Sequence, residues 1–199
     1  LSAPRRHVQI VFAGKAHPAD DAGKQHLQQI YSHATDPVYG GRIAFVDDYD
    51  LHVAHFLTQG CDVWLNTPRK PLEASGTSGM KAGINGVPHL SIGDGWWAEG
   101  YNGANGWVVD GGRSMDDPDA QDAADADALY RLLEDQVVPT YYQRDQDGLP
   151  HAWLRIVKEC VRTITPQFCA ARMLKQYVEE SYVPAARQSK DSSAPQVRS

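Results

Sequence analysis

A run of small residues surrounds a single lysine between residues 73 and 87, where the sequence reads EASGTSGMKAGINGV. Glycine lets a backbone approach a ligand closely. The lysine, Lys81, can then serve in either of two ways. It can neutralise a bound anion, or it can attack a carbonyl group as a nucleophile if burial removes water from its amine.

The first alternative is an anion site at the start of a helix. Thr77, Ser78 and Gly79 are expected to open the helix that carries Lys81. Free backbone N–H groups and the positive end of that helix would then face the anion. The segment lacks the GxxxxGK[ST] pattern, and nothing after Lys81 resembles a magnesium-binding hydroxyl. A phosphate group is therefore favoured over a nucleoside triphosphate.

The second alternative is a nucleophilic lysine. Met80, Ala82, Gly83 and Ile84 surround Lys81 and predict a buried helix. Loss of water would lower the pKa of the amine and favour a Schiff base with an aldehyde. Pyridoxal phosphate carries both an aldehyde and a phosphate, so it would use the lysine and the anion site together. An ordinary solvated helix lysine also fits the local sequence.

Strands and helices alternate along the first half of the chain. Short apolar runs predict buried strands, and segments with apolar residues at helical spacing predict the helices between them. This alternation with short links is typical of an α/β fold, in which helices flank a parallel sheet. The predicted strands cover 7–14, 42–49, 61–67 and 88–94, and the predicted helices cover 18–34, 50–60 and about 79–86.

The rest of the chain predicts a loop and a set of helices. A loop rich in glycine and aromatic residues spans 95–112 with a short strand at 106–109, and proline-punctuated helices follow residue 123. Ligands of parallel sheets bind at the carboxyl ends of the strands. Because the segment 67–78 follows a strand, we expect the small-residue loop at that rim. The aromatic side chains could either stack on a sugar ring or pack the loop onto the domain; they are Trp96, Trp97, Tyr101 and Trp107.

Composition narrows the class of protein. The chain has 199 residues, of which 42% are hydrophobic, so one buried domain is expected. Its net charge of −6 argues against a nucleic-acid partner. The three cysteines form no CxxC and favour a reduced, cytoplasmic setting, and no apolar run is long enough to span a membrane. His52 and His55 lack an evident third ligand, so no metal site is predicted.

A close resemblance to the α-glucan (glycogen and maltodextrin) phosphorylase family is carried by EASGTSGMKAGINGV and by LSIGDGWWAEGYNGANGW. It extends to VFAGKAHPADDAGK and VDDYD, and it covers about residues 7–186. Within the family, the sequence is most similar to the short bacterial-type branch. The resemblance implies a Rossmann-like domain over 1–186, the C-terminal half of a GT-B glycosyltransferase, followed by a disordered tail over 187–199.

The resemblance also implies a reaction and a cofactor. The family transfers glucosyl units from α-1,4-glucans to inorganic phosphate, giving glucose 1-phosphate, with pyridoxal phosphate held by the lysine that matches Lys81. The phosphate of the cofactor relays a proton in that reaction. Carried over to this sequence, Lys81 is the catalytic and cofactor-bearing residue. Thr77, Ser78 and Gly76 would bind the cofactor phosphate, and Tyr49 would lie beside the pyridoxal ring.

The sugar-binding residues implied by the resemblance lie just before the helix. Glu73 would accept a hydrogen bond from a sugar hydroxyl, and Ser75 and Gly76 would donate backbone N–H groups nearby. A carboxylate can accept two hydroxyl hydrogen bonds and so orient a ring, which agrees with this role.

Two other functions remain open as alternatives. Nucleotide-sugar enzymes of the GT-B fold, such as starch and glycogen synthases, often carry Glu-x7-Glu, in which the second carboxylate holds the ribose. Here Lys81 stands eight positions after Glu73, which favours the phosphorylase. The other alternative is a glucan-binding module without catalysis.

Parts of the family's active site do not occur in these 199 residues. The upstream basic segment of the type YKR and the N-terminal GT-B domain are both missing. The chain by itself is therefore expected to be inactive. Its last helix, which would otherwise cross to the first domain, is expected to expose an apolar patch and to promote self-association.

Overall fold

The structure, a computed structural model, describes residues 6–112 and 117–192. The chain divides into two compact units. Unit 1 comprises residues 1–61 and 109–154, and unit 2 comprises residues 62–108 and 155–199. The prediction of one domain over 1–186 stays a prediction, and the two units are described separately below.

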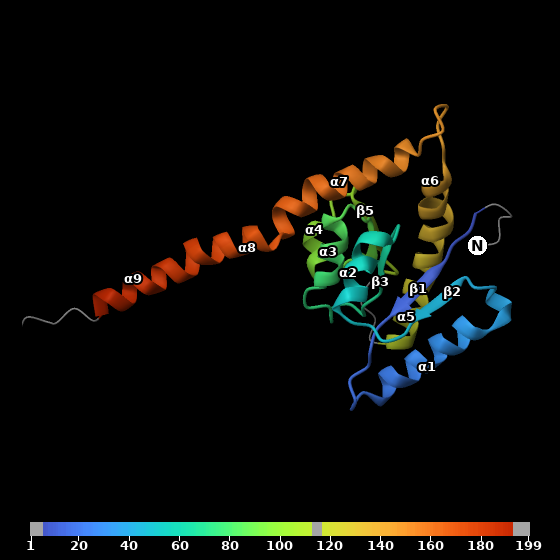
Figure 1. Cartoon of the computed structure of the whole chain (residues 1–199), viewed down its shortest axis with the longest axis horizontal. Coiled ribbons are helices and arrows are strands. Elements are labelled where there is room, and N and C mark those ends of the chain that lie inside the picture. Colours follow the sequence, from blue (N-terminus) through green and yellow to red (C-terminus); the bar gives the residue numbers. More distant parts are fainter. Residues whose placement is uncertain (1–5, 113–116, 193–199) are drawn as a thin grey trace, which may run out of the picture. The chain divides into compact units, whose positions relative to one another are not determined.

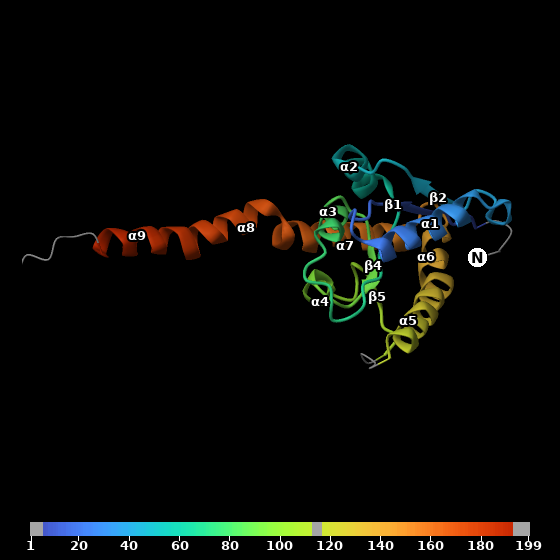
Figure 2. The ribbon, with the colours of Figure 1, turned by 90° about the horizontal axis from the view of Figure 1, so that it is seen from below.

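Unit 1 begins with two parallel strands joined by a helix (Figure 1). Strand β1 (Ile10–Ala13) pairs with β2 (Ile43–Val46), and α1 (Asp21–Thr35) lies between them in sequence and packs against β2 (Figure 2). Helix α2 (Leu51–Gly60) follows β2. Aspartates cap both helices, and the side chain of Asp50 accepts the Val53 N–H at 2.8 Å. These elements confirm the predicted strand–helix alternation.

The second segment of unit 1 is helical. It contains α5 (Pro118–Leu132), a wider turn of π-helix at Leu133–Val137, α6 (Val138–Tyr142) and the start of α7 (His151–Phe168). The hydroxyl of Tyr142 joins this segment to the chain before β1, because it accepts the His7 N–H at 2.9 Å and donates to the His7 carbonyl at 2.6 Å.

Unit 2 is built on a second sheet, in the order β3-β4-β5. Strand β3 (Trp64–Asn66) is parallel to β4 (His89–Ile92), and β5 (Gly106–Val109) borders β4 on the other side. Helix α3 (Thr77–Ile84) connects β3 to β4, and α4 (Trp96–Gly100) follows β4. The predicted α/β class with parallel strands is therefore confirmed, although the strands form two sheets, one in each unit.

The core of unit 2 lies between α3, α4 and α7. Trp96, Trp97, Cys160 and Ile164 form a buried cluster, and Met80, Ile84, Val108, Ile156 and Phe168 pack against it. All four residues of β4 are buried as well. This packing places α3, which carries Lys81, on a well-filled interior.

Of the four prolines predicted to punctuate the last helices, Pro150 does so directly before α7, whereas the other three lie within helical segments. Pro166 lies inside α7, and Pro139 and Pro184 lie near the starts of α6 and α9 (Val183–Ser192). Pro139 and Pro184 each lie two residues after the end of a π-helical turn, the second of which spans Val178–Tyr182 after α8 (Ala170–Tyr177). A wider turn leaves room for a proline ring, which would otherwise clash with a carbonyl of the preceding turn.

The predicted disordered tail is also partly helical. Helix α9 runs to Ser192, so a tail beginning at residue 187 starts within that helix. Alanines 185 and 186, Arg187 and Gln188 are good helix formers, and they extend a helix that has already begun. Residues 193–199 lie outside the described residues.

Candidate functional site

The small-residue loop leads into α3 through a left-handed glycine. Gly76 has φ of +88° and occupies the N-cap position of α3. A Cβ atom at this position would lie 3.0 Å from Cδ1 of Trp96, so both the backbone and the space demand glycine. No side chain caps the first turn. The amides of Thr77 and Ser78, which are exposed, therefore remain available to an anion.

Glu73 is held at the carboxyl ends of two parallel strands. Its N–H donates to Oδ2 of Asp94 at 2.9 Å, just after β4. Its Oε2 accepts from the side-chain amide of Asn66 at 3.4 Å, at the end of β3. The loop thus lies at the rim where ligands of parallel sheets bind, as predicted. The half-buried carboxylate keeps capacity for further hydrogen bonds.

The turn between β4 and α4 supports the same loop. The carbonyl of Ser75 accepts the N–H of Trp96 at 2.8 Å. Gly95 has φ of +55°, and a Cβ there would approach both the Ser75 carbonyl oxygen and Cγ of Glu73 to 2.7 Å. Residues 73–76 therefore pack closely against the turn between β4 and α4. Sequence reasoning missed the positioning role of Asp94, for which the only signal was a carboxylate between two glycines after a strand.

Lys81 is exposed to solvent on α3. We expected burial to remove water from its amine, and in this chain that expectation is wrong. Gly79, Ala82 and Gly83 are the buried residues of α3, at the i, i+3, i+4 spacing of one helix face. Lys81 projects from the opposite side. Small residues bring the helix close to α7, since a Cβ on Gly83 would lie 2.6 Å from Cδ1 of Ile164.

The tryptophans of the 95–112 loop pack the interior. Trp96, Trp97 and Trp107 are buried, and the indole N–H of Trp97 donates to the carbonyl of Trp107 at 3.1 Å. Of the two roles that the sequence left open, packing is the one that these tryptophans fulfil in this chain. Tyr101 is exposed and lies 5.3 Å from Trp97 between ring centroids.

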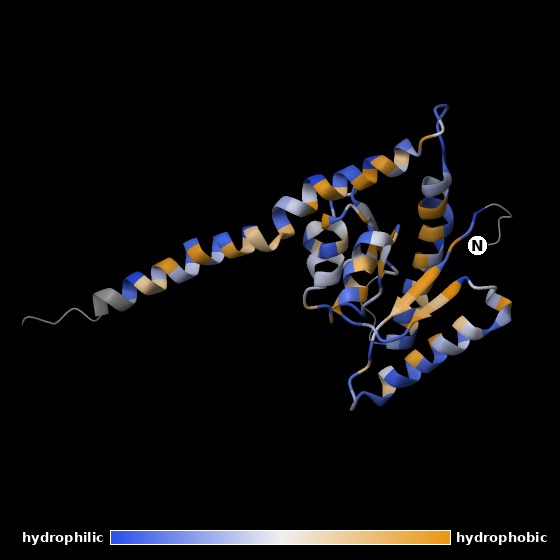
Figure 3. Ribbon diagram, in the orientation of Figure 1, coloured by the Kyte–Doolittle hydropathy of each residue, from blue (hydrophilic) through white to orange (hydrophobic). Residues whose placement is uncertain are grey.

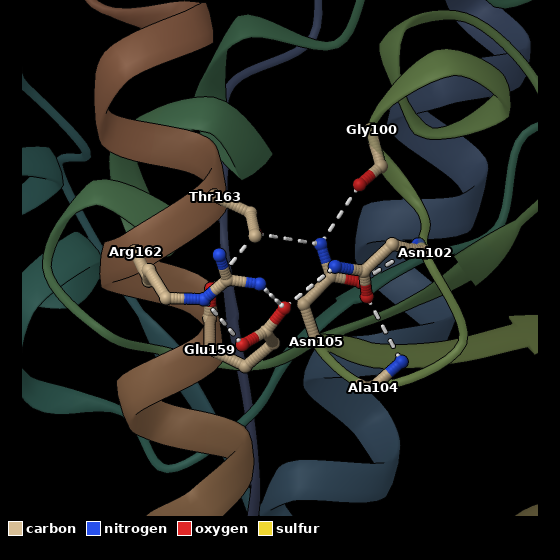
Figure 4. A network of polar contacts seen from close by, with 7 residues as sticks. All are labelled: Gly100, Asn102, Ala104, Asn105, Glu159, Arg162 and Thr163. Carbon is tan, nitrogen blue, oxygen red and sulfur yellow. Dashed lines mark hydrogen bonds and ion pairs between the residues drawn. The ribbon is translucent and has the colours of Figure 1, made fainter.

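A polar network fixes the segment after α4 to α7 (Figure 4). The fully buried amide of Asn105 donates to the Gly100 carbonyl at 2.8 Å, and Asn102 donates to Glu159 at 2.8 Å. Arg162 pairs with the same carboxylate at 2.6 Å. Hydrogen bonds from Arg162 and Asn102 hold the pKa of Glu159 below its usual range. The network therefore fixes the chain from Gly100 to Asn105, after α4, to α7.

Tyr49 lies in unit 1, between β2 and α2. It follows Asp48, whose φ of +55° is unusual for a residue other than glycine. Oδ1 of Asp48 accepts from Nζ of Lys15 at 2.8 Å, and this contact lowers the pKa of the aspartate. The pair joins the chain after β1 to the chain after β2. Glu73, Ser75, Gly76, Thr77, Ser78 and Lys81 all lie in unit 2, so a place for Tyr49 beside them stays a prediction.

Comparisons with known proteins agree on one family. The family model for carbohydrate phosphorylases matches residues 3–100. Glycogen phosphorylase of Aquifex aeolicus is 56% identical over 182 residues, which are 89% of this chain and 25% of that protein. Maltodextrin phosphorylase of Thermococcus litoralis is 48% identical over 183 residues, and glycogen phosphorylase of Mycobacterium bovis is 47% identical over 183. In both, the match covers 92% of this chain and 21% of the relative. The chain thus spans a quarter or less of the length of these relatives.

Proposed function

Because this chain belongs to the α-glucan phosphorylase family, we propose that it forms the cofactor- and sugar-binding part of a glycosyltransferase. The enzyme would transfer glucosyl units from an α-1,4-glucan to inorganic phosphate and release glucose 1-phosphate. The observation that supports this proposal is the segment from Glu73 to Lys81: Glu73 lies at the sheet rim, no side chain caps the first turn of α3, and Lys81 is exposed. Identities of 47% to 56% to proteins named glycogen or maltodextrin phosphorylase support the proposal.

The residues present fit pyridoxal phosphate. The left-handed turn at Gly76 leaves no room for a Cβ and opens the first turn of α3 toward the outside. Amides of Thr77 and Ser78 there would bind the phosphate group, aided by the positive end of the helix. Lys81, exposed one helical turn later, would bind the aldehyde carbon through its amine.

The bound cofactor would supply a phosphate group that exchanges a proton with inorganic phosphate. The chain's own residues would bind and orient the reactants around it. Glu73 would accept a sugar hydroxyl, and it can orient the ring because its backbone is fixed by Asp94 and its carboxylate is held by Asn66. Amides near Ser75 and Gly76 would add neutral donors.

Other parts of the protein would complete the site. The relatives are about four times as long as this chain. We assign the cations that neutralise the two phosphate groups, and the remainder of the glucan cleft, to an N-terminal GT-B domain outside these residues. On this proposal the 199 residues bind the cofactor more weakly than the whole protein and do not turn over glucan alone.

The cellular setting is proposed to be the cytoplasm. Cys160 and Cys169 are free thiols, as is usual in reducing compartments. Burial raises the pKa of the Cys160 thiol to about 12, so it stays protonated. Within residues 6–112 and 117–192, no helix has the length and apolar character needed to cross a membrane.

Cofactor labelling tests the proposal. The chain is incubated with pyridoxal phosphate and reduced with borohydride, and peptides are mapped by mass spectrometry. We expect labelling concentrated on Lys81, loss of that label in Lys81→Ala, and no change in Lys158→Ala, which removes an exposed helical lysine of the same unit. Equal labelling of Lys81 and Lys158 would contradict the proposal. Tight binding of a sugar nucleotide with no label on Lys81 would instead support the nucleotide-sugar alternative.

A further inference from the structure

His89 is a buried histidine whose ring lies directly beneath the helix that carries Lys81. It lies on β4 and is 1% exposed. Neither of its ring nitrogens has a hydrogen-bond partner in the described part of the chain. The imidazole contacts the rings of Trp96 and Trp97, with centroids at 5.1 and 4.8 Å. The indole N–H of Trp96 is also buried without a partner.

Both of these side chains face one residue of α3. A Cβ atom on Gly79 would lie 2.6 Å from Cε1 of His89 and 2.9 Å from Nε1 of Trp96. The first turn of α3 therefore rests directly on the imidazole and the indole, with no space between them for a methyl group. Gly79 adjoins Ser78, and Lys81 follows two residues later. A shift of either ring must move this turn.

The surroundings keep the imidazole uncharged. Burial lowers the pKa of His89 to about 3, and the backbone of Trp64 only partly opposes this. The titratable side chains on α3 and α4 are Lys81 and Glu99, and both are exposed. Strands β3 and β5 carry none, and the nearby thiol of Cys160 stays protonated. A charge on the ring would thus lack a counter-ion and would lie under the positive end of α3.

We infer that the neutral imidazole of His89 positions α3, and that its protonation releases the first turn of the helix together with Thr77, Ser78 and Lys81. The predicted consequence is that acid weakens cofactor binding through α3, and this consequence rests on the proposed function. His89 touches neither substrate nor cofactor in this scheme. It acts as a positioning residue, and its contribution depends on pH.

Hydrogen exchange without cofactor tests the first part. Opening of α3 exposes His89, and the open form gains a proton below the ordinary histidine pKa of about 6.5. The opening constant of the α3 amides should therefore rise up to tenfold per pH unit as the pH falls from 6.5 toward 4. His89→Leu removes the titrating group and keeps an apolar filler, so the slope should vanish. His26→Leu replaces an exposed histidine of unit 1, so the pH dependence of the opening constant should be retained in that variant.

Two results would overturn the inference. In the first, the protection of the α3 amides in the unaltered chain does not change between pH 6.5 and 4 once the intrinsic exchange rate is corrected for. The other is a retained slope in His89→Leu or, should that variant not fold, in His89→Gln. The first result would show that opening of α3 takes up no proton, and the second would show that the proton binds to another group.

Labelling of Lys81 as a function of pH tests the second part and separates the two ideas. We expect the borohydride-reducible label to decline below pH 6.5 in the unaltered chain more steeply than in His89→Leu. A steep slope in hydrogen exchange with no label on Lys81 at pH 8 would support His89 as a positioning residue and contradict the proposed function. A label with the same pH dependence in both proteins would contradict the role of His89 and leave the proposed function standing.

Discussion

Strand β4 (His-Leu-Ser-Ile) and the wholly apolar strand pair β1–β2 differ in how far their residues are buried. Every residue of β4 is buried beneath α3 and α4. In β1, by contrast, Val11 is 51% exposed, and Ala44 of β2 is exposed as well. Figure 3 shows that both of these strands are strongly apolar. Unit 2 therefore buries its central strand β4 completely, whereas the two strands of unit 1 both have exposed apolar residues.

The exposed apolar residues of unit 1 extend beyond the strands. Leu51 is 90% and Phe56 is 58% exposed on α2. The difference between the two units shows that an apolar run predicts a buried strand but does not indicate which part of a protein covers that strand. Changes in unit 2 should affect folding, whereas changes on these faces of unit 1 should affect association.

The largest effect is expected from the core of unit 2. Trp97→Ala removes a fully buried indole and should cost roughly 3–5 kcal/mol of unfolding free energy. The matched change in unit 1 is Phe56→Ala, which should cost less than about 0.5 kcal/mol because the ring is mostly exposed. Urea titrations followed by circular dichroism give both values. Equal losses of unfolding free energy in the two variants would contradict the proposed difference between the units.

A smaller effect is expected from adding one methyl group beneath α3. In Gly79→Ala the new Cβ would overlap the rings of His89 and Trp96, at a cost of about 1–3 kcal/mol. Labelling of Lys81 by pyridoxal phosphate should fall in parallel. Gly14→Ala in unit 1 is the control, since nothing lies within 4 Å of a Cβ there and its φ is ordinary. A gain of stability in Gly79→Ala would show that α3 moves freely on its support.

A still smaller and pH-dependent effect is expected from the network on α7. Its partners lower the pKa of Glu159 in the folded chain, so its carboxylate binds protons more readily when unfolded. The stabilisation is therefore complete above the ordinary pKa of 4.5 and is lost as the pH falls through the lower folded value. Glu159→Gln should be less stable than the unaltered chain at pH 7 and equally stable near pH 2. A difference that persists in acid would assign the loss to packing.

The smallest effect on stability is expected on the exposed strand face. Val11→Thr keeps a β-branched side chain and should change the unfolding free energy by less than about 0.5 kcal/mol. The same change should weaken self-association, which sedimentation velocity measures directly. If self-association is unchanged while the unfolding free energy falls, Val11 contributes to the interior of unit 1 and not to an association surface.

The sequence predicted much of the candidate site because the relevant signals are local. The glycines at 76 and 79 and the strand before the loop placed residues 73–81 at the sheet rim, as observed. The sequence left open whether Lys81 is buried or solvated, because four of its neighbours are apolar or small and only the direction of packing decides which face of the helix is buried. His89 was missed for a similar reason. A histidine within an apolar strand carried no information about the glycine it would meet ten residues earlier.

Regions shaped by longer-range geometry were the least predictable. Prolines normally end helices, yet at 139 and 184 the chain widens one turn beforehand and continues. The helix through Ser192 likewise depends on the turns before it and not on its own polar composition. Asp94 likewise positions Glu73 through a hydrogen bond that joins residues 21 positions apart in the sequence.

The widened turn at Leu133–Val137 changes which side of its helix each residue occupies. Ala128 and Val137 are both buried, although nine residues amount to about two and a half α-helical turns, which would set them on opposite sides. By taking up one additional residue, the wide turn brings Val137 back toward the side of Ala128. Deleting a single residue from this segment should restore regular winding without disturbing that alignment, and it would drive the ring of Pro139 against the backbone instead. The steric requirement of Pro139, and not the alignment of Ala128 with Val137, therefore opposes the loss of a residue from this turn.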